Sequence, residues 1–203
     1  EDSPLLTIVF PALVVTMMTS DIEDIVVPGC ACLCAFVRAA AEQVAAVEIQ
    51  GKSMVECYST VALRLLRFGS EGAAAAAADI ISALFLKCRM QVDGSLAQLL
   101  GTALLRLRVA RGIALREAIV QVFARLVVED ASATLSFLKQ HTLSSPAHPA
   151  LSVLLYIWAR YHHEFTQDYA RKVTTAALGA LFAFGDEKIL STAVPCLVVR
   201  HVQ

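Results

Sequence analysis

The sequence predicts an all-α fold of stacked antiparallel helix pairs, and three observations support this prediction. Apolar residues recur at spacings of three and four along most of the 203 residues, which is the periodicity of a helix face. Breaks rich in Gly, Ser, Asp or Pro interrupt this pattern at fairly regular intervals. No segment shows sustained apolar–polar alternation or an Asn-Gly turn, so no β-strand is expected.

The first two helix pairs are expected over residues 4–47 and 51–90. In the first pair, Pro11 loosens the first helix, and a Thr-Ser-Asp turn supplies capping oxygens for a long second helix. In the second pair, Gly69 separates the two helices, and the second helix contains the alanine run Ala73–Ala78. This run has high helix propensity and allows close helix approach, or else it is a low-complexity tract without a further role.

The last three pairs are expected over residues 92–128, 131–164 and 166–203. Within them, residues 149–184 should form an antiparallel hairpin, because the break between its helices is too short to let them part. Trp158, the only tryptophan, is expected in the core of this hairpin. The apolar face of the second helix is predicted to consist of Tyr169, Val173, Ala176, Ala177, Ala180, Leu181 and Phe184.

Composition and spacing together predict a repeat architecture. Hydrophobic residues make up 57% of the chain and charged residues 17%, so most helices must be covered on more than one side. Pair starts follow one another at about 35 to 47 residues, which is typical of a HEAT- or armadillo-type α-solenoid. Apolar residues at both ends lack the polar outer face of a terminal repeat. We therefore expect residues 1–203 to be a single continuous HEAT-repeat segment of a longer array.

Charge and cysteine placement argue against nucleic-acid and metal binding. The net charge is −1 and the pI is near 6.6, without a basic patch for phosphates. Cys30 and Cys34 share a helix face while Cys32 points the other way, so they lack the converging spacing of a zinc site. Buried free thiols explain the six cysteines better.

Membrane insertion and catalysis are not expected either. Pro and Gly interrupt the long uncharged runs, and the chain opens with two acidic residues; a membrane helical protein is kept as an alternative. No phosphate-binding, dinucleotide-binding, zinc-protease or nucleophile-elbow motif occurs. His162 and His163 diverge by roughly 100 degrees on a helix, so they cannot share a metal there, and a solvated helix end explains them. Neither enzyme activity nor a cofactor is expected.

One N-terminal segment has the HEAT layout of a proline in the first helix, an aspartate at the turn and then a second helix. This segment is FPALVVTMMTSDIEDIVVPGCACLCAFVRAAAEQV. With VQVFARLV at residues 120–127, it resembles the importin-9 branch of the importin-β (karyopherin) family of nuclear transport receptors. The resemblance is densest at Pro149, Ala150, Leu151, Trp158, Phe165, Tyr169, Lys172, Val173, Ala177 and Leu178.

The resemblance implies a superhelical solenoid that carries basic cargo, such as histones and ribosomal proteins, into the nucleus and releases it to Ran-GTP. Such a receptor shuttles between cytoplasm and nucleus and has nucleoporins as further partners. The family's main Ran contacts lie in N-terminal repeats that this segment would not contain, and the family's acidic inserts are missing here. Another HEAT-repeat scaffold, such as a phosphatase or trafficking adaptor, is the alternative function.

In importin-like solenoids the second helix of each pair lines the inner surface, so its side turned away from the seam should meet cargo. The cargo-facing candidates are Arg38, Glu42, Asp79, Glu117, Gln121, Tyr156, Arg160 and His163. A merely solvated face is the alternative reading of these positions. Acidic turns would add weaker, salt-sensitive attraction to basic cargo; they contain Asp21, Glu23, Asp24, Glu129 and Asp130.

Overall fold

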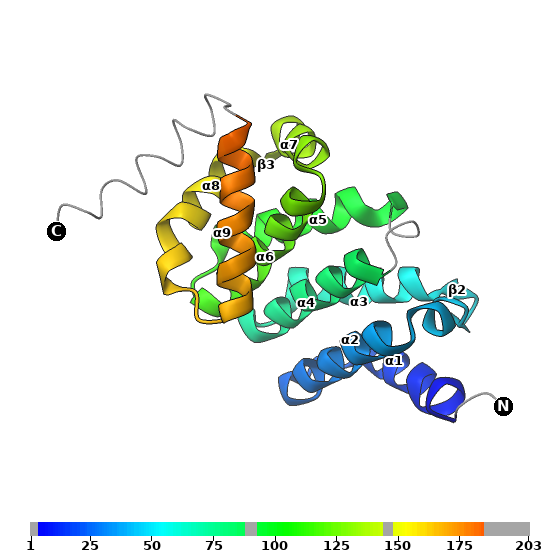
Figure 1. Cartoon of the computed structure of the whole chain (residues 1–203). Coiled ribbons are helices and arrows are strands. Elements are labelled where there is room, and N and C mark those ends of the chain that lie inside the picture. Colours follow the sequence, from blue (N-terminus) through cyan, green and yellow to red (C-terminus); the bar gives the residue numbers. More distant parts are fainter. Residues whose placement is uncertain (1–3, 88–92, 144–147, 185–203) are drawn as a thin grey trace. The chain divides into compact units, whose positions relative to one another are not determined.

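The computed structural model describes residues 4–87, 93–143 and 148–184, which form an all-α fold compatible with a helical-repeat solenoid (Figure 1). The predicted fold class is thereby confirmed. The chain divides into two compact units, a first unit at Glu1–Ala103 and a second unit at Leu104–Gln203. Cys88, Cys196 and the tail of the last predicted pair lie outside the described residues.

The first unit contains two helix pairs and the start of a third. Its helices are η1 (Leu5–Val9), α1 (Phe10–Thr19), α2 (Glu23–Ala45), α3 (Met54–Phe68), α4 (Glu71–Lys87) and the beginning of α5 (Asp93–Val109). Pro11 stands in the first turn of α1, where a missing backbone N–H costs little. α2 is kinked at Ala40, which has non-helical backbone angles.

The core of the first unit lies where α2 and α4 pack along each other. Most of the alanine run of α4 is buried, and its small side chains let α2 come close. α2 contributes a buried face that includes Leu33 and Val37. Tyr58 on α3 is also buried, and its hydroxyl donates a hydrogen bond to the Leu33 carbonyl at 2.9 Å. The alanine run therefore has a packing role.

Two short antiparallel ladders depart from the expectation that the chain has no strand. One pairs β1 (Glu48–Ile49) with β2 (Lys52–Ser53), and the other pairs β3 (Thr142–Leu143) with β4 (His148–Pro149). Gln50 and Gly51 have positive φ values of 54° and 73° between β1 and β2, which is the backbone of a tight hairpin turn. A two-residue ladder is too short to show apolar–polar alternation, so the sequence does not predict these strands.

α3 begins with a capping box that follows directly from its sequence. The Glu56 backbone N–H donates to Ser53 Oγ at 3.3 Å, and the Ser53 backbone N–H donates to Glu56 Oε2 at 2.8 Å. Further along α3, Arg64 reaches back to the turn between α1 and α2. It forms an ion pair with Asp21 and donates to the carbonyls of Met17 at 2.9 Å and Ser20 at 2.6 Å.

The described residues of the second unit form the end of α5 and four further α-helices. They are α6 (Ile113–Glu129), α7 (Ala131–Gln140), α8 (Ala150–Tyr161) and α9 (Asp168–Ala183), with the 3-10 turn η3 (His162–Glu164) between the last two. α8 and α9 run in opposite directions on either side of η3 (Figure 1). Trp158 is fully buried, as predicted. The most extensive partner of α9, however, is α6 rather than α8.

The predicted buried face of α9 is partly wrong. Tyr169 and Phe184 are 54% and 53% exposed. The side chains that are buried are those of Ala170, Thr174, Ala177, Leu178 and Leu181. Small residues on this face let α9 approach α6 closely, and the one hydroxyl among them is satisfied because Thr174 Oγ1 donates to the Ala170 carbonyl at 2.7 Å.

The cysteines of α2 behave as the helical spacing predicts. Cys30 and Cys34 are buried, whereas Cys32 is exposed, which corrects the expectation of a buried thiol at that position. Burial raises the pKa of Cys30 to about 12 and that of Cys34 to about 11, so both thiols stay protonated and unreactive at neutral pH. Among the described residues, no group of three or more His, Cys, Asp or Glu side chains is arranged to hold a metal ion.

α2 is also the one helix of the described chain whose length and apolar composition would suffice to cross a membrane. Of its most apolar window, 33% is buried. Core helices of soluble proteins meet the same criterion, and α2 packs along α4 through its apolar face.

Candidate protein-binding surfaces

The eight predicted cargo-facing residues fall into both units of the chain. In the first unit, Arg38 and Glu42 on α2 and Asp79 on α4 are exposed. Asp79 raises the pKa of the buried Cys34 and Arg38 lowers it, so both charges lie near this thiol. The packing of α2 on α4 therefore brings Arg38 and Asp79 into one neighbourhood of mixed charge.

Glu117 and Gln121 on α6 are not exposed, which corrects their predicted placement. Glu117 is 2% exposed and Gln121 is 7% exposed. The Glu117 carboxylate accepts hydrogen bonds from the backbone N–H groups of Thr166 and Gln167 at 3.2 and 2.9 Å, and from the Thr166 hydroxyl at 3.3 Å. Thr166 and Gln167 directly precede α9, so Glu117 stabilises the start of that helix and is unavailable to cargo.

The remaining three candidates lie on or just after α8. Tyr156 and Arg160 are exposed. His163 is exposed too and its Nε2 lies 3.5 Å from Glu164 Oε1. The neighbouring His162 does not lie at a fully solvated helix end, because it is half-buried and its Nε2 lies 2.9 Å from Thr174 Oγ1.

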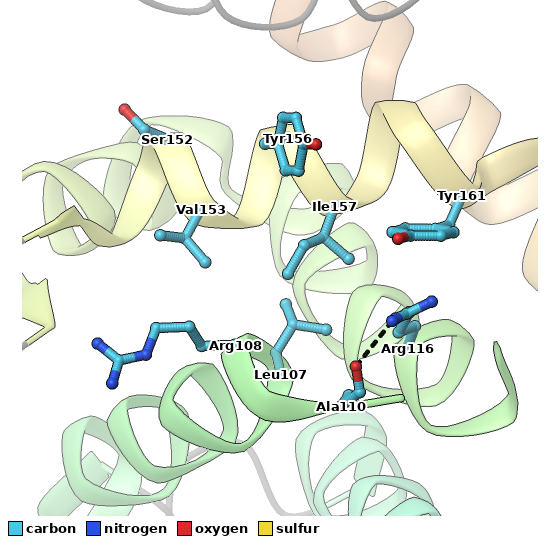
Figure 2. Close-up of a pocket in the computed structure, with 9 residues that line it drawn as sticks. All are labelled: Leu107, Arg108, Ala110, Arg116, Ser152, Val153, Tyr156, Ile157 and Tyr161. Atoms are coloured by element: carbon cyan, nitrogen blue, oxygen red, sulfur yellow. Dashed lines mark hydrogen bonds between the residues drawn. The ribbon is translucent and has the colours of Figure 1, made fainter. Parts of the chain in front are cut away.

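Tyr156 borders a groove within the second unit, between the end of α5, the start of α6, and α8 (Figure 2). The groove has a volume of about 700 Å³. Figure 2 shows Leu107 from the end of α5 pointing toward Val153 and Ile157 of α8, which form an apolar floor. Its remaining lining residues are Arg108, Ala110, Arg116, Ser152 and Tyr161. Among the described residues, the lining contains two arginines and two tyrosines and no carboxylate.

Arg116 is held in a fixed position at one end of the groove. Its Nη2 donates to the Ala110 carbonyl at 2.8 Å, and its guanidinium carbon lies 3.9 Å from the centre of the Tyr161 ring. The Arg160 guanidinium lies 5.7 Å from the centre of the same ring. Arg116 forms no ion pair with any other residue that the structure describes. Its charge is therefore positioned by neutral groups.

The two units carry charges of opposite sign. Residues 1–103 contain 11 Asp and Glu against 6 Lys and Arg, a formal net charge of −5. Residues 104–203 contain 7 Asp and Glu against 11 Lys and Arg, a formal net charge of +4. The nearly balanced charge of the whole chain hides this division. Each unit is consequently suited to a partner of different charge.

Sequence reasoning identified Tyr156 and Arg160 but missed Arg108, Arg116 and Tyr161. A signal for the arginines was present, since Arg106, Arg108, Arg111 and Arg116 crowd the junction between two predicted helices. The groove itself has no signal in the sequence, because it depends on how α8 packs near that junction. Periodicity describes one helix at a time and does not register such a juxtaposition.

Comparison with known proteins supports a distant importin-like relationship. No protein-family model matches the chain. The chain is 27% identical over 187 residues to importin-9 of Drosophila melanogaster, an alignment that covers 91% of this chain and 18% of the relative. The chain thus spans about a fifth of the length of that protein. Together with the all-α architecture, this match is consistent with a distant importin-like helical-repeat segment.

Proposed function

We propose that this chain is a segment of a nuclear transport receptor and acts as a binding scaffold for basic protein cargo, such as histones and ribosomal proteins. The observation that carries the proposal is the alignment with importin-9 across 91% of the chain. A scaffold of this kind binds and releases partners without catalysis. It shuttles between cytoplasm and nucleus, releases its cargo to Ran-GTP and meets nucleoporins on its route.

The charge of the first unit supports basic cargo. Its net charge of −5 attracts cationic proteins, and its surface carries exposed carboxylates at Glu23, Asp24, Glu42 and Asp79. We therefore assign the cargo contact of this segment to the exposed surface of α2 and α4, with Glu42 and Asp79 as its acidic members.

We further propose that residues 1–203 form one continuous part of a longer repeat array. The importin-9 relative is more than five times as long as the aligned segment. Large apolar side chains on η1 and at the start of α2 are exposed, which suits packing against an adjacent repeat. These side chains are Leu5, Ile8, Val9, Ile25 and Val27.

The proposal is tested with the native protein that carries this chain, purified from cells. It is titrated with a histone dimer, and GTP-locked Ran is then added to the complex. A transport receptor binds the histones and releases them on addition of Ran-GTP but not of Ran-GDP. Histone binding that ignores the nucleotide state of Ran would contradict the proposal and favour the alternative of a HEAT-repeat adaptor.

A further inference from the structure

The groove of the second unit has chemistry opposite to that proposed for the cargo surface of the first unit. Arg108 and Arg116 line it, none of its described lining residues carries a carboxylate, and the surrounding unit has a formal net charge of +4. A basic protein entering this groove would meet like charges, which costs binding free energy. The groove therefore calls for a different occupant.

Arg116 is prepared to bind an anion. A guanidinium has five N–H donors, and the Ala110 carbonyl is the one hydrogen-bond acceptor for Arg116 that the described residues provide. Stacking on Tyr161 at 3.9 Å restricts the plane of the guanidinium, so less conformational entropy is lost when a carboxylate binds its free edge.

The apolar floor of the groove favours a ligand that carries an apolar group as well as an anionic one. Of its apolar lining residues, Leu107 and Ile157 are buried and Val153 is partly exposed. Tyr156 is 48% exposed beside this floor and offers a large, rigid contact surface. Tyrosines and arginines of this kind are the residue types that most often dominate protein–protein binding energy.

We propose that this groove binds an acidic peptide segment of a partner protein. A carboxylate of the segment pairs with Arg116, and a neighbouring apolar side chain rests on Leu107, Val153 and Ile157. A volume of about 700 Å³ accommodates a short segment of this type. This site lies beyond the proposed transport of basic cargo and adds a second partner of opposite charge.

The lining favours a peptide over nucleic acid. Nucleic-acid binding draws its affinity from a series of phosphate contacts along a positively charged track. Here two arginines flank an apolar floor, and the floor has no counterpart in a phosphate backbone. A peptide supplies both the carboxylates and the apolar side chain within a few residues.

The test uses the 203-residue chain and a short fluorescein-labelled peptide in which glutamates flank a single leucine. Fluorescence anisotropy should show binding that weakens as salt rises. Replacing the glutamates by lysines should abolish it, and replacing the leucine by serine should weaken it. A single-stranded oligonucleotide of equal charge should bind more weakly; if it binds as well as the peptide or better, the proposal is overturned.

A pair of variants locates the site. Val153→Glu places a carboxylate in the lining of the groove, and Val153→Gln has nearly the same shape without the charge. Val153→Glu should bind the peptide about tenfold or more weakly than Val153→Gln. Tyr156→Ala should also weaken binding about tenfold. Equal affinities of the Glu and Gln variants, with unchanged melting temperatures, would overturn the proposal.

Discussion

The Glu117 carboxylate on α6 caps the N-terminus of α9, because its Oε1 accepts a hydrogen bond of 2.9 Å from the backbone N–H of Gln167. The backbone N–H of Thr166 donates to Oε2 of the same carboxylate at 3.2 Å. A helix N-terminus has unpaired N–H groups and a partial positive charge, and a carboxylate satisfies both. A side chain of one helix thereby fixes where another helix begins, 50 residues further along the chain.

The first prediction follows from this contact. Glu117→Gln keeps the shape of the side chain but removes its charge and leaves buried donors poorly matched. We expect it to lower the free energy of unfolding by about 1–3 kcal/mol in urea titrations. The control is Glu129→Gln at the exposed end of the same helix, which should change the free energy by less than about 0.5 kcal/mol. Equal effects of the two variants would show that the cap does not stabilise the fold.

A second prediction concerns Trp158 on α8. Its side chain is fully buried, so Trp158→Ala should leave a large cavity and cost about 3–5 kcal/mol of unfolding free energy. Tyr156→Ala, two residues away on the exposed side, should cost less than about 1 kcal/mol. Thermal melts followed by circular dichroism compare the two variants. A Trp158→Ala protein that melts at the temperature of the parent would place the tryptophan outside the core.

The sequence was sufficient to predict the fold class because helix breaks have strong local signals. Gly69 ends α3 and Pro11 marks the first turn of α1, as local chemistry requires. The register of α9 was missed because its buried face consists of small residues, whereas the aromatic Tyr169 and Phe184 are exposed. Ranking residues by hydrophobicity alone thus selects the wrong side of that helix.

The candidate surfaces were predictable only where exposure follows from one helix. Arg38, Glu42 and Asp79 are exposed as the periodicity indicated. The same periodicity predicted that Glu117 lies on the exposed side of its helix. It is buried instead, because its hydrogen-bond partners are backbone N–H groups far along the chain. A backbone donor has no residue-type signature, so sequence reasoning could not distinguish a solvated carboxylate from a buried cap.

The third prediction tests the link between α3 and the turn that joins α1 to α2. Arg64 donates to two backbone carbonyls and pairs with Asp21. Arg64→Ala should cost about 1–3 kcal/mol, since it leaves carbonyls of the turn without their donor. Asp21→Asn should cost at most about 1 kcal/mol, because the Asp21 side chain is 89% exposed and its ion pair is screened.

Arg67→Ala on the same helix provides the matched control, since Arg67 is exposed. Urea titration of the three variants gives the order of their effects. A larger loss for Asp21→Asn than for Arg64→Ala would contradict the dominant role of the carbonyl contacts.

A fourth prediction is a pH dependence that arises at His162. Burial lowers the pKa of His162 below 6.5. A hydrogen bond that the ring donates to the Arg171 backbone acts in the opposite direction, and the nearby charges of Arg171 and His163 lower the pKa further. The unfolded state therefore binds a proton at a higher pH than the folded state does. The free energy of unfolding should decrease as the pH falls from 6.5 toward the folded-state pKa.

His162→Asn should remove this component, while His163→Asn should retain it. Thermal unfolding across this pH range compares both variants with the parent. If the parent gained stability relative to His162→Asn on acidification, the sign of the shift would be wrong.

The last prediction concerns the proposed cargo surface of the first unit. Glu42 is exposed on α2, and it lies among the second-helix positions expected to meet basic cargo. In the native protein that carries this chain, Glu42→Lys should weaken binding of a histone dimer about threefold to tenfold at low salt, and less at high salt. Glu48→Lys makes the same charge change at an exposed position of β1, outside that face, and serves as the control. Because both variants change the net charge equally, a general attraction would weaken binding equally in both. Only a greater loss for Glu42→Lys supports a contact at this face, and equal losses would assign the attraction to the overall charge of the unit.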